Sequence, residues 1–276
     1  MISASTRVAG VIGDPVRHSL SPLLHNAAYE ALGLDWVYVA FEVPSGRAAA
    51  ALDAAVALGL VGLSVTMPHK ADAARRCDRL TAEAARLGAV NTVTVAPDGL
   101  LHGDSTDGEG FLRSLRAAGH DVAGARVLVL GAGGAARAVA AACAGAGAQV
   151  TVDGPASRRR TRRGGGVRRA ARTVGGPRRP RRRRDGGRER DTPVGMAEPG
   201  TPLAPGAVGP GQVYVDLIYH PRETEMMVAA AAAGAEVVGG LGMLVHQAAL
   251  QVERWTGRAA PLEPMRAAVD RALATR

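Results

Sequence analysis

Cysteine and long apolar segments are scarce in this chain of 276 residues. Its 2 cysteines, Cys77 and Cys143, are solitary, with no Cys-x-x-Cys spacing and no histidine ligands beside them. We therefore expect neither a disulfide framework nor a metal site. No apolar run approaches the roughly 20 residues that span a bilayer, and the N-terminal residues around Arg7 do not resemble a signal peptide. The sequence thus predicts a cytoplasmic protein with no membrane partner.

Lysine is scarcer still, because Lys70 is the only lysine among 34 Lys and Arg residues. A guanidinium stays charged, whereas a partly buried ammonium can release its proton, so the two side chains are not interchangeable in acid–base chemistry. Lys70 follows the apolar segment 61–66, which reads as a strand, and strand ends of this kind often carry active-site residues. We interpret Lys70 as a candidate general acid or base; an ordinary solvated lysine is the alternative.

The formal net charge of +9 is unevenly distributed. Sixteen arginines between Arg158 and Arg190 are balanced only by Asp185 and Glu189, so this stretch carries +14 and the rest of the chain −5. A basic protein often has a nucleic-acid partner. Here the body of the protein is mildly acidic, and we do not expect nucleic acid to bind it.

The segment 154–190 is dominated by Arg, Gly and Pro and shows no apolar periodicity. Such composition is typical of disordered arms that bind nucleic acid. A shifted reading frame is the other interpretation, and we favour it. Arg188-Glu189-Arg190-Asp191 can be encoded as CGT GAA CGC GAC, and the same bases read one position later give Val-Asn-Ala-Thr. That would be an apolar strand end of the kind that the surrounding region lacks.

The rest of the chain alternates short apolar segments with alanine-rich ones, which predicts an α/β fold. Strands are expected at 7–13, 36–43, 61–66, 88–93, 126–130, 149–152, 213–218 and 236–238. Helices are expected at 23–32, 47–58, 71–87, 111–118 and 223–233, followed by the C-terminal helices. Asp98-Gly99 predicts a hairpin turn.

Two serines precede the first predicted helix. Ser21 stands before Pro22 and suits a helix N-cap, but capping does not account for Ser19. Two hydroxyls together with the free N–H groups of a helix N-terminus could instead bind a carboxylate.

Three further polar residues stand out, and each has two interpretations. Asn91 lies in an apolar strand, where a buried amide either ties down a turn or holds a polar ligand. Asp107 precedes a predicted helix and is either its N-cap or the carboxylate partner of Lys70. Gln247 follows the apolar periodicity of its helix and either bonds to backbone or points into a ligand cleft. Taken by itself, this residue favours the backbone interpretation.

A glycine-rich turn follows the predicted strand 126–130 directly. Gly131, Gly133 and Ala136 match G-x-G-x-x-G/A between a strand and an alanine-rich helix, where glycines let the backbone approach a pyrophosphate. The next strand ends at Asp153, where an acid about 20 residues after the first glycine would bind the ribose of NAD. The aberrant segment that follows weakens this assignment.

Together these motifs resemble the shikimate dehydrogenase family. The resemblance covers nearly the whole chain except 154–190 and rests on the order Ser19-Leu20-Ser21-Pro22, Val65-Thr66-x-Pro68-x-Lys70, Gly88-Ala89-Val90-Asn91-Thr92, Thr106-Asp107-Gly108, Gly131-Ala132-Gly133-Gly134-Ala135, Thr192-Pro193-x-Gly195-Met196 and Gly242-Met243-Leu244-Val245-x-Gln247-Ala248. Such an ordered set is far more specific than any one member.

The resemblance implies an NADP-dependent oxidoreductase of chorismate and aromatic amino-acid biosynthesis that interconverts 3-dehydroshikimate and shikimate, as a monomer or homodimer. It implies Lys70 and Asp107 as the catalytic pair. The implied substrate residues are Ser19, Ser21, Thr66, Asn91, Tyr219 and Gln247. The implied cofactor residues are Gly131, Gly133, Gly134, Ala135, Gly240 and Met243.

It also implies two α/β domains with the site in the cleft between them. Residues 1–106 and the C-terminal helices 240–276 would form the substrate domain, and residues 107–239 a Rossmann-like, doubly wound NADP domain interrupted by the arginine-rich insert. Two alternatives stay open. One is an NAD-preferring quinate/shikimate dehydrogenase that uses Asp153, and the other is a catalytically impaired relative whose arginine-rich segment binds nucleic acid.

Two serines depart from the family pattern. Ser64 and Ser105 stand at positions where the family that the chain resembles commonly has asparagine. The hydrogen bonding around each serine is therefore open at this point.

Overall fold

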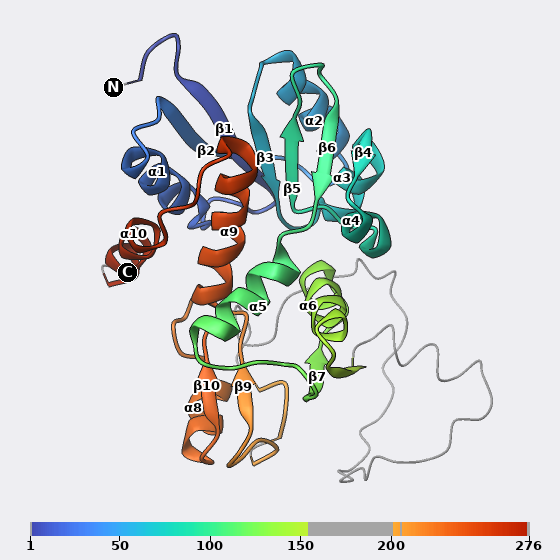
Figure 1. Cartoon of the computed structure of the whole chain (residues 1–276), viewed down its shortest axis with the longest axis vertical. Coiled ribbons are helices and arrows are strands. Elements are labelled where there is room, and N and C mark those ends of the chain that lie inside the picture. Colours follow the sequence, from blue (N-terminus) through green and yellow to red (C-terminus); the bar gives the residue numbers. More distant parts are fainter. Residues whose placement is uncertain (1, 154–200, 205, 275–276) are drawn as a thin grey trace, which may run out of the picture.

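The computed structural model describes residues 2–153, 201–204 and 206–274. Figure 1 shows two lobes, one built on strands β1 to β6 and the other on β7 to β10. Helices α5 (Asp107–Ala117) and α9 (Leu241–Thr256) run between the lobes. Among the described residues, no helix is long and apolar enough to cross a membrane.

The first lobe contains a six-stranded mixed sheet in the order β2-β1-β3-β5-β6-β4. Its strands are β1 (Arg7–Gly13), β2 (Trp36–Glu42), β3 (Gly62–Val65), β4 (Arg79–Leu80), β5 (Thr92–Val95) and β6 (Leu101–Asp104). β1 pairs in parallel with β2 and β3, whereas β5 runs antiparallel to β3 and β6. The expected turn at Asp98-Gly99 is confirmed, because it joins β5 to β6 with Gly99 at φ +81°.

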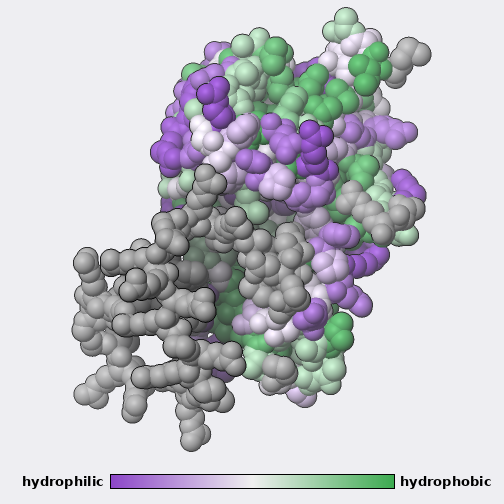
Figure 2. Space-filling view, turned by 180° about the vertical axis from the view of Figure 1, so that it is seen from behind, coloured by the Kyte–Doolittle hydropathy of each residue, from purple (hydrophilic) through white to green (hydrophobic). Residues whose placement is uncertain are grey.

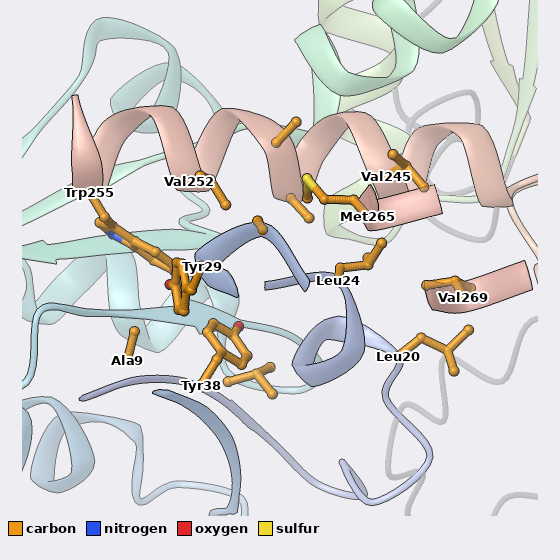
Figure 3. Close-up of a cluster of buried hydrophobic side chains, with 14 of the residues drawn as sticks. Ala9, Leu20, Leu24, Tyr29, Tyr38, Val245, Val252, Trp255, Met265 and Val269 are labelled. Carbon is orange, nitrogen blue, oxygen red and sulfur yellow. The ribbon is translucent and has the colours of Figure 1, made fainter. Parts of the chain in front are cut away.

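Helices cover both faces of this sheet. Because successive side chains of a strand point to opposite faces, neighbouring residues of β1 enter different cores. Val11 faces a core that includes α1 (Ser21–Ala31), α9 and α10 (Leu262–Ala274), whereas its neighbour Ile12 faces α2 (Ala48–Ala57) and α3 (Lys70–Arg76). Figure 3 shows the first of these cores, with side chains from β1, β2, α1, α9 and α10 converging on one another.

The helix expected over 71–87 is wrong, because the chain breaks it into α3, β4 and α4 (Ala82–Leu87). Cys77 adopts an extended conformation at the end of α3, and the Asp78 carboxylate accepts a hydrogen bond from the N–H of Leu101 at 2.8 Å. The chain then pairs with β6 before the Thr81 hydroxyl caps α4. A tertiary strand pairing therefore overrides the helical propensity of this alanine-rich segment.

In the described part of the chain, the second lobe contains two parallel βαβ units. The first comprises β7 (Arg126–Leu130), α6 (Gly134–Gly145) and β8 (Gln149–Asp153), and the second comprises β9 (Val213–Val215), α8 (Glu225–Ala232) and β10 (Glu236–Val238). These units confirm the α/β architecture. Both interpretations of the arginine-rich segment concern residues that lie outside the described part of the chain.

Helices α5 and α9 cross at close range where both carry glycine. A Cβ atom on Gly110 would lie 2.7–2.9 Å from the Cβ, N and Cα atoms of Gln247. Gly242, five residues earlier on α9, approaches the hydroxyl of Ser114 in the same way. The crossing brings the N-terminus of α5, where Asp107 lies, close to both lobes (Figure 1).

Polar and apolar residues are interspersed over the face of the first lobe that Figure 2 presents.

Candidate active site

Lys70 and Asp107 form an ion pair in which Nζ lies 2.6 Å from Oδ2. Lys70 is the first residue of α3, after β3, and Asp107 is the first residue of α5. Their side chains are 18% and 9% exposed, so water only partly screens the pair. The N-cap of α5 is Thr106, not Asp107. Asp107 is therefore the ion-pair partner of Lys70 in this structure and not the N-cap of its helix.

Asn91 holds the other oxygen of this carboxylate. Its Nδ2 donates to Oδ1 of Asp107 at 2.7 Å, and its Oδ1 accepts from the Thr106 N–H at 2.8 Å and from the Thr92 hydroxyl at 2.8 Å. The side chain is buried. Asn91 thus ties down the turn before α5, and both carboxylate oxygens of Asp107 have a donor.

The two serines lie at the N-terminus of α1, as expected, but the expectation that Ser21 caps this helix is wrong. Ser21 is its first residue, Leu20 is the N-cap, and the cap makes no side-chain bond. Instead the Ser19 hydroxyl accepts a hydrogen bond from the Ser21 N–H at 3.2 Å. Ser19 thus makes the side-chain contact at this helix N-terminus that was expected of Ser21, and Pro22 takes one of the first helical positions.

Three other predicted substrate residues lie on separate elements. Thr66 follows β3, and its N–H donates to Ile12 at 3.0 Å. Tyr219 follows β9 and packs against the core around α1 and α9. The Gln247 amide donates to the carbonyl of Leu244 at 2.9 Å, which is the backbone interpretation of this residue.

The glycine-rich turn is suited to a pyrophosphate. Gly131 has φ +121°, a conformation that favours glycine, and donates to the carbonyl of Asp153 at 2.9 Å. Gly133 is the N-cap of α6, and among the described residues no side chain caps the first N–H groups of this helix. Ala135 lies in its first turn. These residues fit a dinucleotide cofactor.

The turn also meets the ion pair, because a Cβ atom on Gly134 would lie 3.1 Å from Cδ of Lys70. The expected cofactor residues and the expected catalytic lysine are therefore in contact although they belong to different lobes.

The remaining predicted cofactor residues lie where the second lobe meets α9. Gly240 packs on the backbone of Leu217 and Ile218, which precede Tyr219, and a Cβ atom there would lie within 3 Å of both carbonyl oxygens. Met243, one turn along α9, is buried in the hydrophobic cluster of the second lobe.

The loop that carries Tyr219 is held by a residue that the sequence analysis missed. The buried Asp216 carboxylate accepts from the Ile218 N–H at 2.9 Å and from the Thr224 hydroxyl at 2.7 Å. Thr224 in turn caps α8. An aspartate can accept the backbone N–H of the residue two positions later and so fix a turn. An Asp at the start of a loop is therefore the signal that could have identified Asp216.

The two departures from the family pattern are both bonded. The Ser64 hydroxyl donates to Gln251 at 2.7 Å and accepts from the Tyr38 hydroxyl at 2.6 Å. The Ser105 N–H donates to the Asp104 carboxylate at 2.8 Å. Gln251 was also missed in the sequence, although it lies one helical turn after Gln247.

His25, on α1 behind the serines, predicts a dependence of stability on pH. It stacks on Tyr38 with ring centroids 4.0 Å apart, and burial lowers its pKa from 6.5 to about 4. Between these values the unfolded chain binds a proton that the folded chain rejects. The stability that His25 contributes is therefore complete above pH 6.5 and is lost as pH falls toward 4.

We expect the free energy of unfolding in urea to fall between pH 7 and pH 5 by about 2 kcal/mol more in wild type than in His25→Phe. His18→Asn, a change at an exposed histidine, is the control and should keep the wild-type pH dependence. Equal losses in wild type and His25→Phe would contradict the assignment.

A strand-linked glycine-rich turn in contact with a lysine–carboxylate pair is the arrangement of a nicotinamide-dependent oxidoreductase. Two family profiles match the chain, the "Shikimate dehydrogenase substrate binding domain" at residues 11–93 and the "Shikimate 5'-dehydrogenase C-terminal domain" at residues 240–269. The shikimate dehydrogenase (NADP(+)) of Methanopyrus kandleri is 45% identical, over 97% of this chain and 96% of that protein.

Two solved structures extend this similarity. A shikimate 5-dehydrogenase from Thermus thermophilus in complex with NADP(H) and shikimate has a TM-score of 0.81 and 36% identity, covering 97% of this chain and 100% of that one. The enzyme from Listeria monocytogenes, in complex with shikimate and NAD, has a TM-score of 0.77 and 29% identity, covering 97% and 98%. This chain belongs to the shikimate dehydrogenase family.

Proposed function

We propose that this chain catalyses the NADP-linked, reversible reduction of 3-dehydroshikimate to shikimate. The observation that carries the proposal is the contact between the two parts of the site. Lys70 Nζ lies 2.6 Å from Asp107, and the stem of the same lysine lies against Gly134 in the turn suited to the cofactor. A proton donor and a cofactor position are thus brought together at one point.

The bound nicotinamide supplies the hydride that a ring ketone requires. The developing alkoxide must receive a proton. Lys70, which lies beside the glycine-rich turn, can donate one. Asp107 accepts from Nζ, orients it and stabilises its charge, while Asn91 keeps the carboxylate in place. In the oxidation direction, Lys70 takes the hydroxyl proton and releases it to solvent.

The substrate site in this proposal consists of hydroxyls and amides that suit a small polyhydroxy acid. Ser19 and Ser21 at the N-terminus of α1 would bind the carboxylate, since such an N-terminus favours an anion. Thr66, Asn91, Tyr219 and Gln247 would surround the ring. Gly240 and Met243 would lie on the nicotinamide side.

The proposal also divides the chain. Residues 1–106 with 240–276 form the substrate domain and residues 107–239 the cofactor domain, which is supported by the six-stranded sheet of the first lobe and the βαβ units of the second. It further includes a cytoplasmic location, a monomeric or homodimeric state and no nucleic-acid partner.

A second candidate is an NAD-preferring enzyme, and one observation favours it. Asp153 ends β8, and its carbonyl accepts the N–H of Gly131 at 2.9 Å, so it lies beside the cofactor turn. A carboxylate in this place would accept hydrogen bonds from the ribose of NAD and repel the 2′-phosphate of NADP.

The test is reduction of NADP and of NAD, in parallel assays, on addition of shikimate to the purified full chain. We expect turnover with NADP. We also expect Asp153→Asn to raise the ratio of kcat/KM for NADP to that for NAD by about tenfold, because one charge opposite the 2′-phosphate is removed. Asp98→Asn, which removes an acid in the β5–β6 turn, is the control and should leave the ratio unchanged. Turnover with NAD alone would favour the second candidate, and the absence of turnover with either cofactor would contradict both.

A further inference from the structure

A continuous chain of side-chain hydrogen bonds connects Tyr38, on the edge strand β2 of the six-stranded sheet, to the ion pair. The Tyr38 hydroxyl donates to Ser64 at 2.6 Å, and Ser64 donates to Oε1 of Gln251 at 2.7 Å. The Gln251 amide donates to the Thr92 hydroxyl at 3.1 Å. From there the chain continues through Asn91 to Asp107, at 2.8 Å and 2.7 Å.

The members come from separate elements that only the folded chain brings together. Strand alternation turns Ser64 of β3 away from Leu63 and Val65 and toward Tyr38 of β2 and Gln251 of α9. Every member from Tyr38 to Asp107 is buried. Water therefore cannot replace a lost partner at little cost, and each bond constrains the next.

The direction of every bond in this chain follows from the carboxylate at its end. Ionised Asp107 can only accept, so the NH₂ group of Asn91 must face it and the Asn91 carbonyl must face Thr92. The Thr92 hydroxyl then donates to the Asn91 oxygen, and its lone pair accepts from the Gln251 amide. The Gln251 carbonyl in turn faces Ser64, whose lone pair accepts from Tyr38.

We propose that Tyr38, Ser64 and Gln251 are positioning residues for the catalytic pair, acting through Thr92 to hold the Asn91 amide in the orientation that donates to Asp107. The inference rests on the proposed function for its kinetic consequence. A rotated Asn91 amide would turn its oxygen toward the carboxylate of Asp107, which would repel it. The Thr92 hydrogen on the Asn91 oxygen opposes that rotation, together with the Thr106 N–H that donates to the same oxygen at 2.8 Å.

Tyr38→Phe tests the far end of the chain, because it deletes one oxygen and keeps the aromatic ring. We expect kcat for shikimate oxidation to fall about threefold to tenfold, the effect of one hydrogen bond, with KM for shikimate changed by less than about twofold. Tyr29→Phe is the matched control. Tyr29 belongs to the same core as Tyr38 (Figure 3), and its buried hydroxyl has no hydrogen-bond partner in the described part of the chain, so kcat should not change.

Ser64→Ala breaks the chain nearer the site and should lower kcat at least as much. If both residues act through one chain, the double variant should be no slower than Ser64→Ala alone. If the two substitutions were independent packing defects, the fold-reductions in kcat would instead multiply in the double variant. Values of kcat for Tyr38→Phe and Ser64→Ala that match Tyr29→Phe, or effects that multiply, would overturn the proposal.

A second measurement does not depend on turnover. The Thr106 amide donates to the Asn91 oxygen at 2.8 Å, so its hydrogen exchange reports the orientation of this side chain. Exchange should be faster in Tyr38→Phe than in Tyr29→Phe, and equal rates would overturn the positioning role. An inactive wild type would contradict the proposed function alone, whereas an active wild type with unaffected variants would contradict only this inference.

Discussion

Lys70→Ala is expected to lower kcat by about 10²- to 10⁴-fold, the usual contribution of a general acid or base, while the dissociation constant for shikimate changes little. The 2.6 Å contact with Asp107 places Nζ against the carboxylate that orients it, and the chain has no other lysine. Alanine removes the transferable proton but leaves the hydroxyls and amides of the substrate site. The measurements are steady-state kinetics with NADP and the dissociation constant for shikimate without cofactor.

Two further variants make the Lys70 result specific. Lys70→Arg keeps a cation beside Asp107 but does not release a proton, so it should also be slow. Arg75→Ala removes a positive charge from the same helix at an exposed position, where Arg75 pairs with Asp72, and should keep wild-type kcat. Turnover of Lys70→Ala within about tenfold of wild type would remove Lys70 from the mechanism.

Gly110→Ala is expected to have the second large effect, on stability and turnover together. The added Cβ atom would lie 2.7–2.9 Å from backbone and Cβ atoms of Gln247, where no flexible side chain can move aside. Overpacking of this kind costs about 1–3 kcal/mol. Because α5 also carries Asp107, separation of the two helices should displace Asp107 from Lys70 and lower kcat.

Gly145→Ala is the control for Gly110→Ala, since Gly145 is also helical and an added Cβ atom there would meet no atom of the described residues within 4 Å. Thermal unfolding and kcat of both variants provide the comparison. We expect Gly145→Ala to be neutral or slightly stabilising, because alanine favours a helix over glycine. A Gly110→Ala protein as stable and active as Gly145→Ala would show that α9 can shift at this crossing without consequence.

Much of the fold could be predicted from local pattern. Short apolar segments identified the strand around Val11, and the Asp98-Gly99 turn followed from residue types alone. The strand expected at 88–93 begins only at Thr92, because Gly88 ends α4 in a left-handed conformation. The helix over 71–87 could not be corrected from the sequence, because its interruption depends on pairing between Arg79 and His102, 23 positions later in the chain.

The candidate site divides in the same way. Lys70, Asp107 and Gly134 were identifiable from rarity and motif, and the structure brings these three together. Asp216 and Gln251 were missed, since an acid and an amide with no motif around them look like ordinary surface or helix residues. Their roles depend on partners that are distant in sequence.

By itself, the sequence determined the α/β class, the family and the order of the chemical groups, because these follow from residue type, period and spacing within short segments. Only the tertiary structure decided that Asp107 faces Lys70 and does not cap its helix, and that the Ser19 hydroxyl, not that of Ser21, accepts a hydrogen bond at the start of α1. The physical reason is that a buried polar group must find a partner wherever the fold supplies one. Local sequence cannot specify that choice when the partner is Tyr38 for Ser64, or Thr92 for Gln251, on another element.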